Sequence, residues 1–336
     1  MYPRLASCGM TSWTVHYDMR APAFGTPAPH LYAAALEQAA WLDERGVTAV
    51  VVSEHHGSDD GYLPSPLVMA AAVAARTRRA VVSVNALTLP LHNPIEAAEQ
   101  CLVVDQISGG RLAVTLVAGY VESEFALYGE PFAGRGAVFD EKLSVFTRAL
   151  TGEPFDHDGR TVRVTPGPVQ RPRPMVFLGG ASPAAARRAA RYGDGFALGG
   201  PERHLGDLYR QACAAEGRPA GPVLVPPQPM AVHVADDPEA AWATIAPHAL
   251  HELNCYGAWA AGAEGQLYQR VADAEQARAD GFYAVVTPDE CVELARRLEA
   301  EHSTVLFKPL IGGLDPDVSW ASFELFVDKV LPALEA

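Results

Sequence analysis

The chain has 336 residues, of which 49% are hydrophobic and 20% are charged, a composition typical of a globular protein with a sizeable core. Its formal net charge of -14 argues against a nucleic-acid partner, because phosphate binding needs clustered lysine and arginine. The five cysteines are odd in number and lack zinc-ligand spacing, as in a reducing compartment. No secretion signal and no apolar run of roughly 20 residues is present, so we expect a cytoplasmic protein without a membrane partner.

Short apolar runs alternate with longer segments of helical periodicity along most of the chain. We predict strands in the runs at 5–10, 48–53, 80–90, 111–119, 174–180, 195–200, 223–234 and 304–313. Strand followed by helix, repeated about eight times, predicts an α/β fold with a parallel sheet closed into a (β/α)8 TIM-type barrel. We expect one domain over residues 1–336, with insertions at the C-terminal face at about 151–174 and 250–287.

The second predicted strand, at 48–53, is followed directly by Glu54, His55 and His56. A barrel places its chemistry at such strand ends, where the loops converge on one mouth. Successive strand residues point to opposite faces, so the two histidines cannot both reach one ion, and we predict no metal site. Two interpretations stay open, since a histidine pair suits proton transfer near neutral pH but also ordinary hydrogen-bonded packing.

The strand at 174–180 ends in Gly179 and Gly180, and the next helix has Ser182 at its N-cap and Pro183 at its first position. Unpaired N–H groups and the helix dipole attract an anion there, and the glycines let a phosphate approach the backbone. Both an anion site and a plain capped barrel helix fit this stretch.

The strand at 111–119 ends in Gly119, which permits a flat ring to lie against the backbone, and Tyr120 could stack on such a ring. Each residue also fits an ordinary structural role, Tyr120 as a packed aromatic. We expect Glu124 to be a solvated charge or a helix cap, and Asp59 and Asp60 to lie in a solvated turn.

These motifs occur in order with LPLHNPIEAAEQ, DQISGGR, GYVESEF, RGAVFDEKL and LFKPLIGGLDPDVSWASFELF. Together they resemble the bacterial luciferase-like flavin-dependent oxidoreductases through most of the chain. The resemblance implies a TIM-type barrel that binds FMN, or in one branch a deazaflavin, at its C-terminal mouth, often as a homodimer.

By this resemblance, His55 matches the catalytic histidine of the family and His56 its neighbour. Asn85 and Ala86 match the place beside the isoalloxazine where the family often has a non-prolyl cis peptide. The remaining cofactor positions are Val117, Ala118, Gly119 and Tyr120 along the flavin and ribityl chain, and Gly180, Ala181 and Ser182, beside Gly179, at the phosphate.

The leading hypothesis is a two-component monooxygenase in which a flavin reductase supplies reduced FMN, and O2 is used to oxygenate a small organic substrate. His55 would act as acid or base, with Glu54 or His56 setting its tautomer and pKa. Ala118 stands where some members have an arginine near the phosphate, which fits a loosely held flavin. The alternatives are a deazaflavin-dependent oxidoreductase, a flavin-binding barrel without catalysis and, with less support, a metal-dependent hydrolase. The residues at 57–63 and around Trp259 are expected to shape the substrate pocket.

Overall fold

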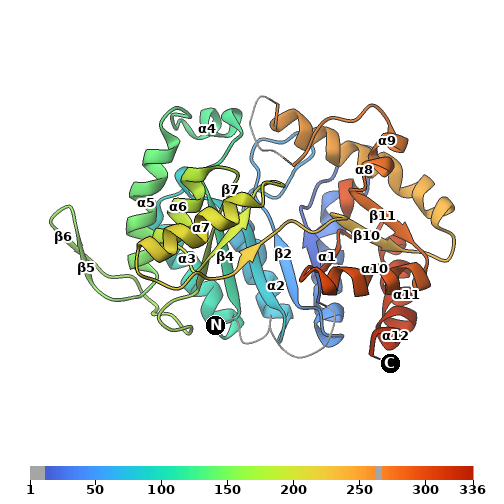
Figure 1. The fold of residues 1–336 in the computed structure, drawn as a ribbon, viewed down its shortest axis with the longest axis horizontal. Coiled ribbons are helices and arrows are strands. Elements are labelled where there is room, and N and C mark those ends of the chain that lie inside the picture. The colour runs from blue at the N-terminus through green and yellow to red at the C-terminus, as the bar shows by residue number, and fades with distance from the viewer. Residues whose placement is uncertain (1–11, 262–266, 336) are drawn as a thin grey trace.

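A computed structural model describes residues 12–261 and 267–335 of the protein (Figure 1). Cys8 and the strand predicted at 5–10 lie outside these residues, as does part of the insertion predicted at 250–287. The first strand that the structure describes is β1 (Trp13–Tyr17).

One sheet of ten strands forms the centre of the described chain, and all of its pairings are parallel. Its order is β11-β10-β12-β1-β2-β3-β4-β7-β8-β9, so the late strand β12 lies beside the first strand. After β1 the strands are β2 (Ala49–Val52), β3 (Val81–Thr88), β4 (Leu112–Val117), β7 (Met175–Gly180), β8 (Gly195–Leu198), β9 (Val223–Leu224), β10 (Ala231–Val234), β11 (Tyr283–Val286) and β12 (Val305–Phe307). The repeated strand–helix order around this sheet confirms the predicted α/β fold of the TIM-barrel type.

Helices surround the sheet, as Figure 1 shows. They are α1 (Ala28–Glu44), α2 (Pro66–Arg76), α3 (Pro94–Ser108), α4 (Glu122–Tyr128), α5 (Arg135–Ala149), α6 (Pro183–Tyr192), α7 (His204–Ala215), α8 (Pro238–Trp259), α9 (Ala274–Ala279), α10 (Pro288–Ala300), α11 (Pro316–Leu325) and α12 (Leu331–Glu335), with short turns η1 (Leu89–Leu91), η2 (Ile311–Gly313) and η3 (Phe326–Val330). Several begin with proline behind a capping side chain: Asn93, for example, accepts the N–H groups of Ile95 and Glu96 ahead of α3.

The strands bury both of their faces, as expected for a parallel sheet covered by helices. In β4 the first five of six residues are buried, and all four residues of β8 are buried. Aromatic side chains from three strands, Phe177, Phe196 and Phe307, are almost fully enclosed in the core. This packing holds the strand ends, and therefore the mouth, in fixed positions.

The run at 223–234 differs from its prediction as a single strand, because it forms two. β9 pairs with β8, whereas β10 pairs with β11 and β12. Prolines at 226, 227 and 229 lie between them, and proline cannot donate to a strand ladder. The segment at 151–174 contains the antiparallel pair β5 (Phe155–His157) and β6 (Arg160–Val162), which projects from the barrel in Figure 1. Within the insertion predicted at 250–287, residues 250–259 are the last part of α8. The short helix α9 follows, and then β11, which is the strand at one edge of the sheet.

The Asp43 carboxylate at the end of α1 ties that helix to the start of β3. It accepts the backbone N–H groups of Arg78, Arg79 and Ala80 at 2.8, 2.9 and 2.6 Å, and Asp43 is 4% exposed. We expect Asp43→Ala to lower the free energy of unfolding by about 2–3 kcal/mol, because buried donors lose their acceptor. Urea denaturation would measure this, with Glu44→Ala, an exposed neighbour, expected to change stability by about 0.5 kcal/mol or less. Equal losses in the two variants would contradict the assignment.

Candidate active site

Four neighbouring strands bring the predicted residues to one mouth. The register pairs Val52 with Val84, Thr88 with Val117, and Leu116 with Leu178, so the C-terminal ends of β2, β3, β4 and β7 lie side by side. The segments that follow these ends therefore approach one another, with Glu54–His56 at one end of the row and 179–182 at the other.

His55 is held by a carboxylate from the segment after β4. Its Nδ1 lies 2.7 Å from Oε1 of Glu124, and the same oxygen accepts the backbone N–H of His56 at 2.9 Å. Glu124 is 2% exposed, so its expected solvation is wrong. An ionised carboxylate can only accept a hydrogen bond, so Nδ1 of His55 carries a proton in this pair, and Nε2 is the ring nitrogen that Glu124 does not bind. The expectation that Glu54 or His56 orients His55 is also wrong.

Glu54 and His56 belong to a separate network on the other side of the strand end. One oxygen of Glu54 accepts the Thr88 N–H at 2.5 Å, and the other lies 2.6 Å from His92 Nε2. The same oxygen lies 3.1 Å from His56 Nε2, but without hydrogen-bond alignment, and His56 Nδ1 meets the Tyr128 hydroxyl at 3.0 Å. Burial alone would raise the pKa of Glu54, but the two imidazoles and the Thr88 N–H outweigh it and lower the pKa to about 2.

Four aromatic rings surround His55. The Trp259 ring is closest, with its centroid 4.3 Å from that of the imidazole, and the Tyr62 ring meets it edge-on at 4.8 Å. Tyr120 and Tyr256 lie at 5.8 and 5.9 Å, and the hydroxyls of Tyr62 and Tyr256 are 2.9 Å apart. These four rings form an aromatic wall, with Tyr62 from the loop after β2, Tyr120 from the segment after β4, and Tyr256 and Trp259 from α8. The wall gives the mouth a largely apolar lining.

A buried arginine contacts three of these four rings. Arg20 is fully buried, its Nε lies 3.1 Å from Asp18, and its Nη1 lies 2.6 Å from Asp60. Its guanidinium carbon sits 4.6–4.8 Å from the centroids of the Tyr62, Tyr256 and Trp259 rings. A desolvated cation in contact with ring faces adds to the packing of those rings.

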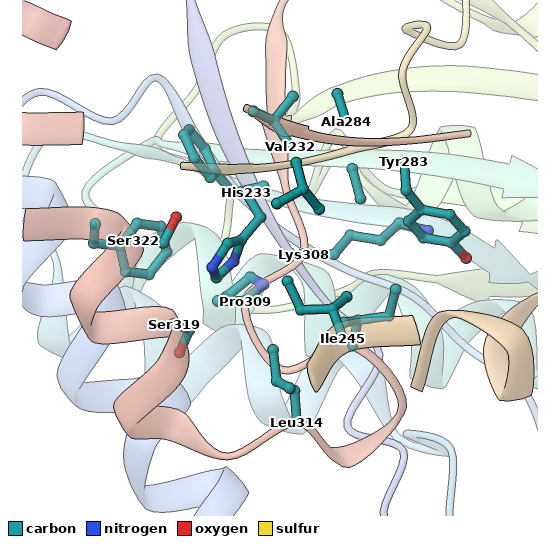
Figure 2. Close-up of a pocket in the computed structure, with 15 residues that line it drawn as sticks. Val232, His233, Ile245, Tyr283, Ala284, Lys308, Pro309, Leu314, Ser319 and Ser322 are labelled. Atoms are coloured by element: carbon teal, nitrogen blue, oxygen red, sulfur yellow. The ribbon is translucent and has the colours of Figure 1, made fainter. Parts of the chain in front are cut away.

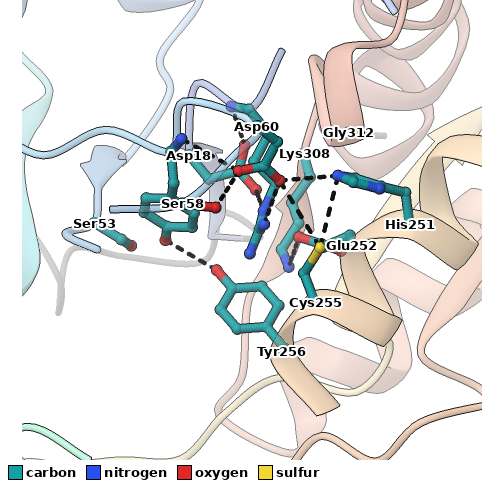
Figure 3. Close-up of polar contacts among 12 residues, drawn as sticks. Asp18, Ser53, Ser58, Asp60, His251, Glu252, Cys255, Tyr256, Lys308 and Gly312 are labelled. Carbon is teal, nitrogen blue, oxygen red and sulfur yellow. Dashed lines mark hydrogen bonds and ion pairs between the residues drawn. The ribbon is translucent and has the colours of Figure 1, made fainter. Parts of the chain in front are cut away.

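Asp60 is 6% exposed, so the predicted solvated turn is wrong at this residue, while Asp59 is exposed. The Oδ2 atom of Asp60 also lies 2.8 Å from Nε2 of His251 on α8, and the Oδ1 atom of Asp60 accepts from the Ser58 hydroxyl (Figure 3). Burial would raise the pKa of Asp60, but the contacts with His251, Arg20 and Ser58 hold it below its usual range. The loop after β2 is thus fastened to α8.

The peptide between Asn85 and Ala86 is cis, as predicted. Ser53 donates to the Asn85 carbonyl at 2.6 Å, and His16 Nε2 lies 2.6 Å from the same hydroxyl. Burial, and next the charge of Lys308, lower the pKa of His16 to about 3, so its ring is neutral. Asn85 is exposed although it lies in a mostly buried strand, so the barrel is open to solvent at this point.

Two glycines at the mouth have no room for a side chain. Gly119 has φ +78°, and a Cβ there would lie 2.8 Å from both Phe125 and Thr88; Gly180 has φ +151°, and its Cβ would lie 2.7 Å from that of Ala185. Ser182 caps α6 as predicted, with its hydroxyl accepting the Ala185 N–H at 3.2 Å. The backbone is therefore bare at both places where a cofactor was predicted.

Two arginines lie beside these segments. Arg135 donates from Nε to the Gly119 carbonyl at 2.9 Å, so it brings a positive charge to the end of β4. Arg188 is bound by Asp140 at 2.6 Å and by the Gly136 carbonyl at 3.1 Å, which leaves it neutralised rather than directed at an anion.

A small cavity lies away from the mouth, between β10, β11, β12 and α11 (Figure 2). His233, Lys308 and Ser322 are among the residues that line its volume of about 20 Å³. Such a space holds about one water molecule, so it cannot accept a flavin or an organic substrate. The candidate active site is therefore the mouth at the strand ends.

The sequence analysis missed Glu124 as the partner of His55, and it missed Arg20 and Tyr256 altogether. One signal was available for Glu124, because it stands in the first turn of a helix directly after a strand end, which faces the mouth of a barrel. Arg20 and Tyr256 carry no such local signal, since their contacts depend on how β1, the loop after β2 and α8 pack together.

Comparison with known proteins shows the family to which the chain belongs. Residues 14–304 match the family described as luciferase-like monooxygenase, and the chain belongs to this family. It is an enzyme of the flavin-dependent oxidoreductase class. The chain is 29% identical over 322 residues to a 4-hydroxyprotoasukamycin monooxygenase of Streptomyces nodosus subsp. asukaensis, covering 88% of this chain and 85% of that protein. It is 28% identical over 218 residues to an FMNH(2)-dependent dimethylsulfone monooxygenase of Pseudomonas putida, covering 61% of this chain and 55% of that protein.

Solved structures show the same fold. The monooxygenase RslO1 from Streptomyces bottropensis matches with a TM-score of 0.79 at 24% identity, over 96% of this chain and 99% of that one. The oxygenating constituent of 3,6-diketocamphane monooxygenase from Pseudomonas putida, in complex with FMN, matches with a TM-score of 0.72 at 19% identity, over 97% and 99% of the two chains. An F420-dependent secondary alcohol dehydrogenase matches with a TM-score of 0.65 at 16% identity, over 97% and 99%.

Among residues 12–261 and 267–335, no helix has both the length and the apolar character needed to cross a membrane.

The depressed pKa of Glu54 predicts an acid-sensitive contribution to stability. A carboxyl group whose folded pKa lies near 2 and whose ordinary value is 4.5 stabilises the fold above pH 4.5 and loses this contribution as the pH falls. Between pH 6 and pH 4 the loss from this group is about 1 kcal/mol. We therefore expect Glu54→Gln to show a smaller decrease in unfolding free energy over this interval than the unmodified protein, measured by urea denaturation. Parallel pH profiles would refute the assignment.

Proposed function

We propose that the protein is a two-component monooxygenase that uses reduced FMN and O2 to oxygenate a small organic substrate. The observation that carries the proposal is the 2.7 Å bond between His55 and Glu124 inside an aromatic-walled mouth at the strand ends. This bond occupies Nδ1 of His55, so Nε2 is the nitrogen available for proton transfer to or from a bound molecule, at the position that matches the catalytic histidine of the family.

The described residues fit a flavin. The exposed Asn85 beside Ala86 would lie under the ring system, with Ala118, Gly119 and Tyr120 along one side of it. The bare backbone at Gly180, Ala181 and the Ser182-capped start of α6 would hold the phosphate. Arg135 supplies positive charge at the end of β4, although Ala118 itself cannot. When bound in its reduced form, the flavin supplies electrons for the activation of O2.

The residues of the chain contribute positioning, exclusion of water and proton transfer. The rings of Tyr62, Tyr256 and Trp259 exclude water from His55 and favour a substrate with an apolar or planar surface. Glu124 keeps the His55 imidazole in one orientation, so that Nε2 can take up and return one proton. Glu54 and His56 support the segment after β2 through their contacts with Thr88, His92 and Tyr128.

The relatives support reduced FMN as a cosubstrate. One is named as FMNH(2)-dependent, and one structural neighbour is the oxygenating constituent of a monooxygenase in complex with FMN. The proposal therefore includes a separate flavin reductase as a partner, and, from the family resemblance, a cytoplasmic homodimer. A deazaflavin-dependent dehydrogenase or reductase is the second candidate, because one structural neighbour is F420-dependent.

The acid/base role of His55 can be tested directly. We expect His55→Ala to bind FMN nearly as well as the unmodified protein but to turn over about a hundredfold more slowly, because a general acid or base is lost. Glu124→Gln should lose part of this rate, since a neutral amide holds the Nδ1–H less firmly. Turnover is measured as O2 uptake with reduced FMN and a panel of organic substrates.

Glu122→Gln is the matched control for Glu124→Gln, because Glu122 is exposed in the same first turn of α4. The control should leave turnover unchanged. An unchanged rate in His55→Ala would remove His55 from the mechanism.

The cofactor is tested by titration of the purified protein with FMN, reduced FMN and the deazaflavin under anaerobic conditions. We expect reduced FMN to bind more tightly than oxidised FMN, and O2 to be consumed when it is admitted. Binding of the deazaflavin alone, without O2 uptake, would reject the monooxygenase and favour the second candidate.

A further inference from the structure

We infer that Asp60, His251 and Cys255 form a binding site for one divalent transition-metal ion of the zinc class, separate from the predicted flavin site. The three residues come from two parts of the chain. Asp60 lies in the loop after β2, and His251 and Cys255 lie one turn apart on α8, where their side chains point to Asp60 (Figure 3). The inference is independent of the proposed function.

The spacing of the three donor atoms is close to that of a tetrahedral site. Cys255 Sγ lies 3.7 Å from His251 Nε2 and 3.9 Å from Asp60 Oδ2, and the latter two atoms are 2.8 Å apart. With usual zinc bond lengths, ligand atoms in a tetrahedron are roughly 3.3–3.6 Å apart. An ion between the three atoms therefore requires shifts of about half an ångström, mainly a separation of imidazole and carboxylate.

The ligand types match a borderline metal. Imidazole and thiolate favour zinc and its neighbours in the first transition row, whereas Mg²⁺ and Ca²⁺ prefer oxygen ligands alone. His251 paired with Asp60 is an imidazolium; on binding, the ion replaces its Nε2 proton, while Nδ1 keeps its own, and also replaces the Cys255 thiol proton, so that two protons pass to solvent. The hydrogen bond between Asp60 and Arg20 Nη1 is retained as outer support for the carboxylate.

Charge also balances at this position. Asp18 contacts Arg20 at 3.1 Å and can neutralise its guanidinium alone. The Asp60 carboxylate and a Cys255 thiolate then carry two negative charges, which match one divalent ion. Lys308, the next buried cation, is bound by Glu252 at 2.8 Å and adds no net charge.

The site is open on one side. His251 and Cys255 are half-buried and line a groove of about 710 Å³ along α8, together with Asn254 and Arg270. An ion can enter from this groove, and its fourth position faces water, as in sites with three protein ligands. This site was not predicted from the sequence, because His251 and Cys255 supply only two ligands on one helix and the third, Asp60, is 191 residues from His251.

A second group, Glu54, His56 and His92, also places donor atoms within 4.8 Å of one another. There the Glu54 oxygen lies 2.6 Å from His92, and the other oxygen accepts the Thr88 N–H, so this carboxylate is hydrogen-bonded at both oxygens, as the Asp60 carboxylate is. No sulfur ligand is present in that group. The observations therefore favour the site on α8.

Cobalt binding tests the inference on the full-length protein. Reduced, EDTA-treated protein is titrated with Co²⁺ without oxygen. We expect saturation at one ion per chain, a near-ultraviolet sulfur-to-cobalt charge-transfer band, visible bands of tetrahedral Co²⁺, and loss of all of them when Zn²⁺ is added. Cys255→Ser should abolish the charge-transfer band, and Cys255→Ser and His251→Gln should each weaken binding by at least about tenfold.

His248→Gln is the matched control, because His248 lies on the same helix but bonds to the Gly312 carbonyl at 2.7 Å. It should bind Co²⁺ like the unmodified protein. Zn²⁺ should raise the melting temperature of the unmodified protein and of the control, since the ion binds the folded state, but not that of the two ligand variants.

Alkylation of Cys255 in the unmodified protein, followed by peptide mass spectrometry, gives a readout that no variant can confound by misfolding. Zn²⁺ should slow this alkylation at least about tenfold, because bound thiolate is no longer a free nucleophile. Absence of stoichiometric binding, a cobalt spectrum without the sulfur band, equal affinity in Cys255→Ser, or an unchanged alkylation rate would each overturn the inference.

Discussion

The mouth of this barrel depends on one buried carboxylate. Oε1 of Glu124 accepts both the ring Nδ1–H of His55 and the backbone N–H of His56, so one atom fixes the direction of the strand end and the tautomer of the catalytic candidate. The bond joins the segment after β2 to the first turn of α4, across the intervening strand β3. Without it, two donors would be buried beside one another with no acceptor, and the adjoining aromatic rings would lose the imidazole against which they pack.

The segment that follows β2 divides the motif between two tasks. His55 turns toward the aromatic wall, whereas Glu54 and His56 turn together to the opposite side and meet His92 and Tyr128. The three consecutive residues therefore act as a catalytic candidate and its scaffold, rather than as one cluster. Adjacent residues in the sequence thus belong to different contacts, with His55 bound to Glu124 and Glu54 bound to His92 and Thr88.

The local pattern of apolar residues was sufficient to predict the fold and the positions of the segments that line the mouth. Buried strands alternating with capped helices predicted the barrel, the position of Glu54–His56 and the start of α6 at Ser182, and the family resemblance predicted the cis peptide at Asn85. The partners were not predictable in the same way. Glu124 is 69 residues from His55 and His251 is 191 residues from Asp60, and no local pattern encodes such contacts. An isolated carboxylate in a polar loop is usually solvated, and only tertiary packing makes Glu124 and Asp60 exceptions.

The loop that contains Asp60 also has a consequence for the order in which the protein is made. Arg20 and Asp60 emerge early during synthesis, but His251, Tyr256 and Trp259, which pack against them, belong to α8 and emerge only after most of the barrel strands. A nascent chain that contains only β1 to β4 has Tyr62 beside His55 but lacks Tyr256 and Trp259. The closed surroundings that this chemistry requires are thus completed late in translation, and a chain that ends before α8 would contain the histidine without its enclosure.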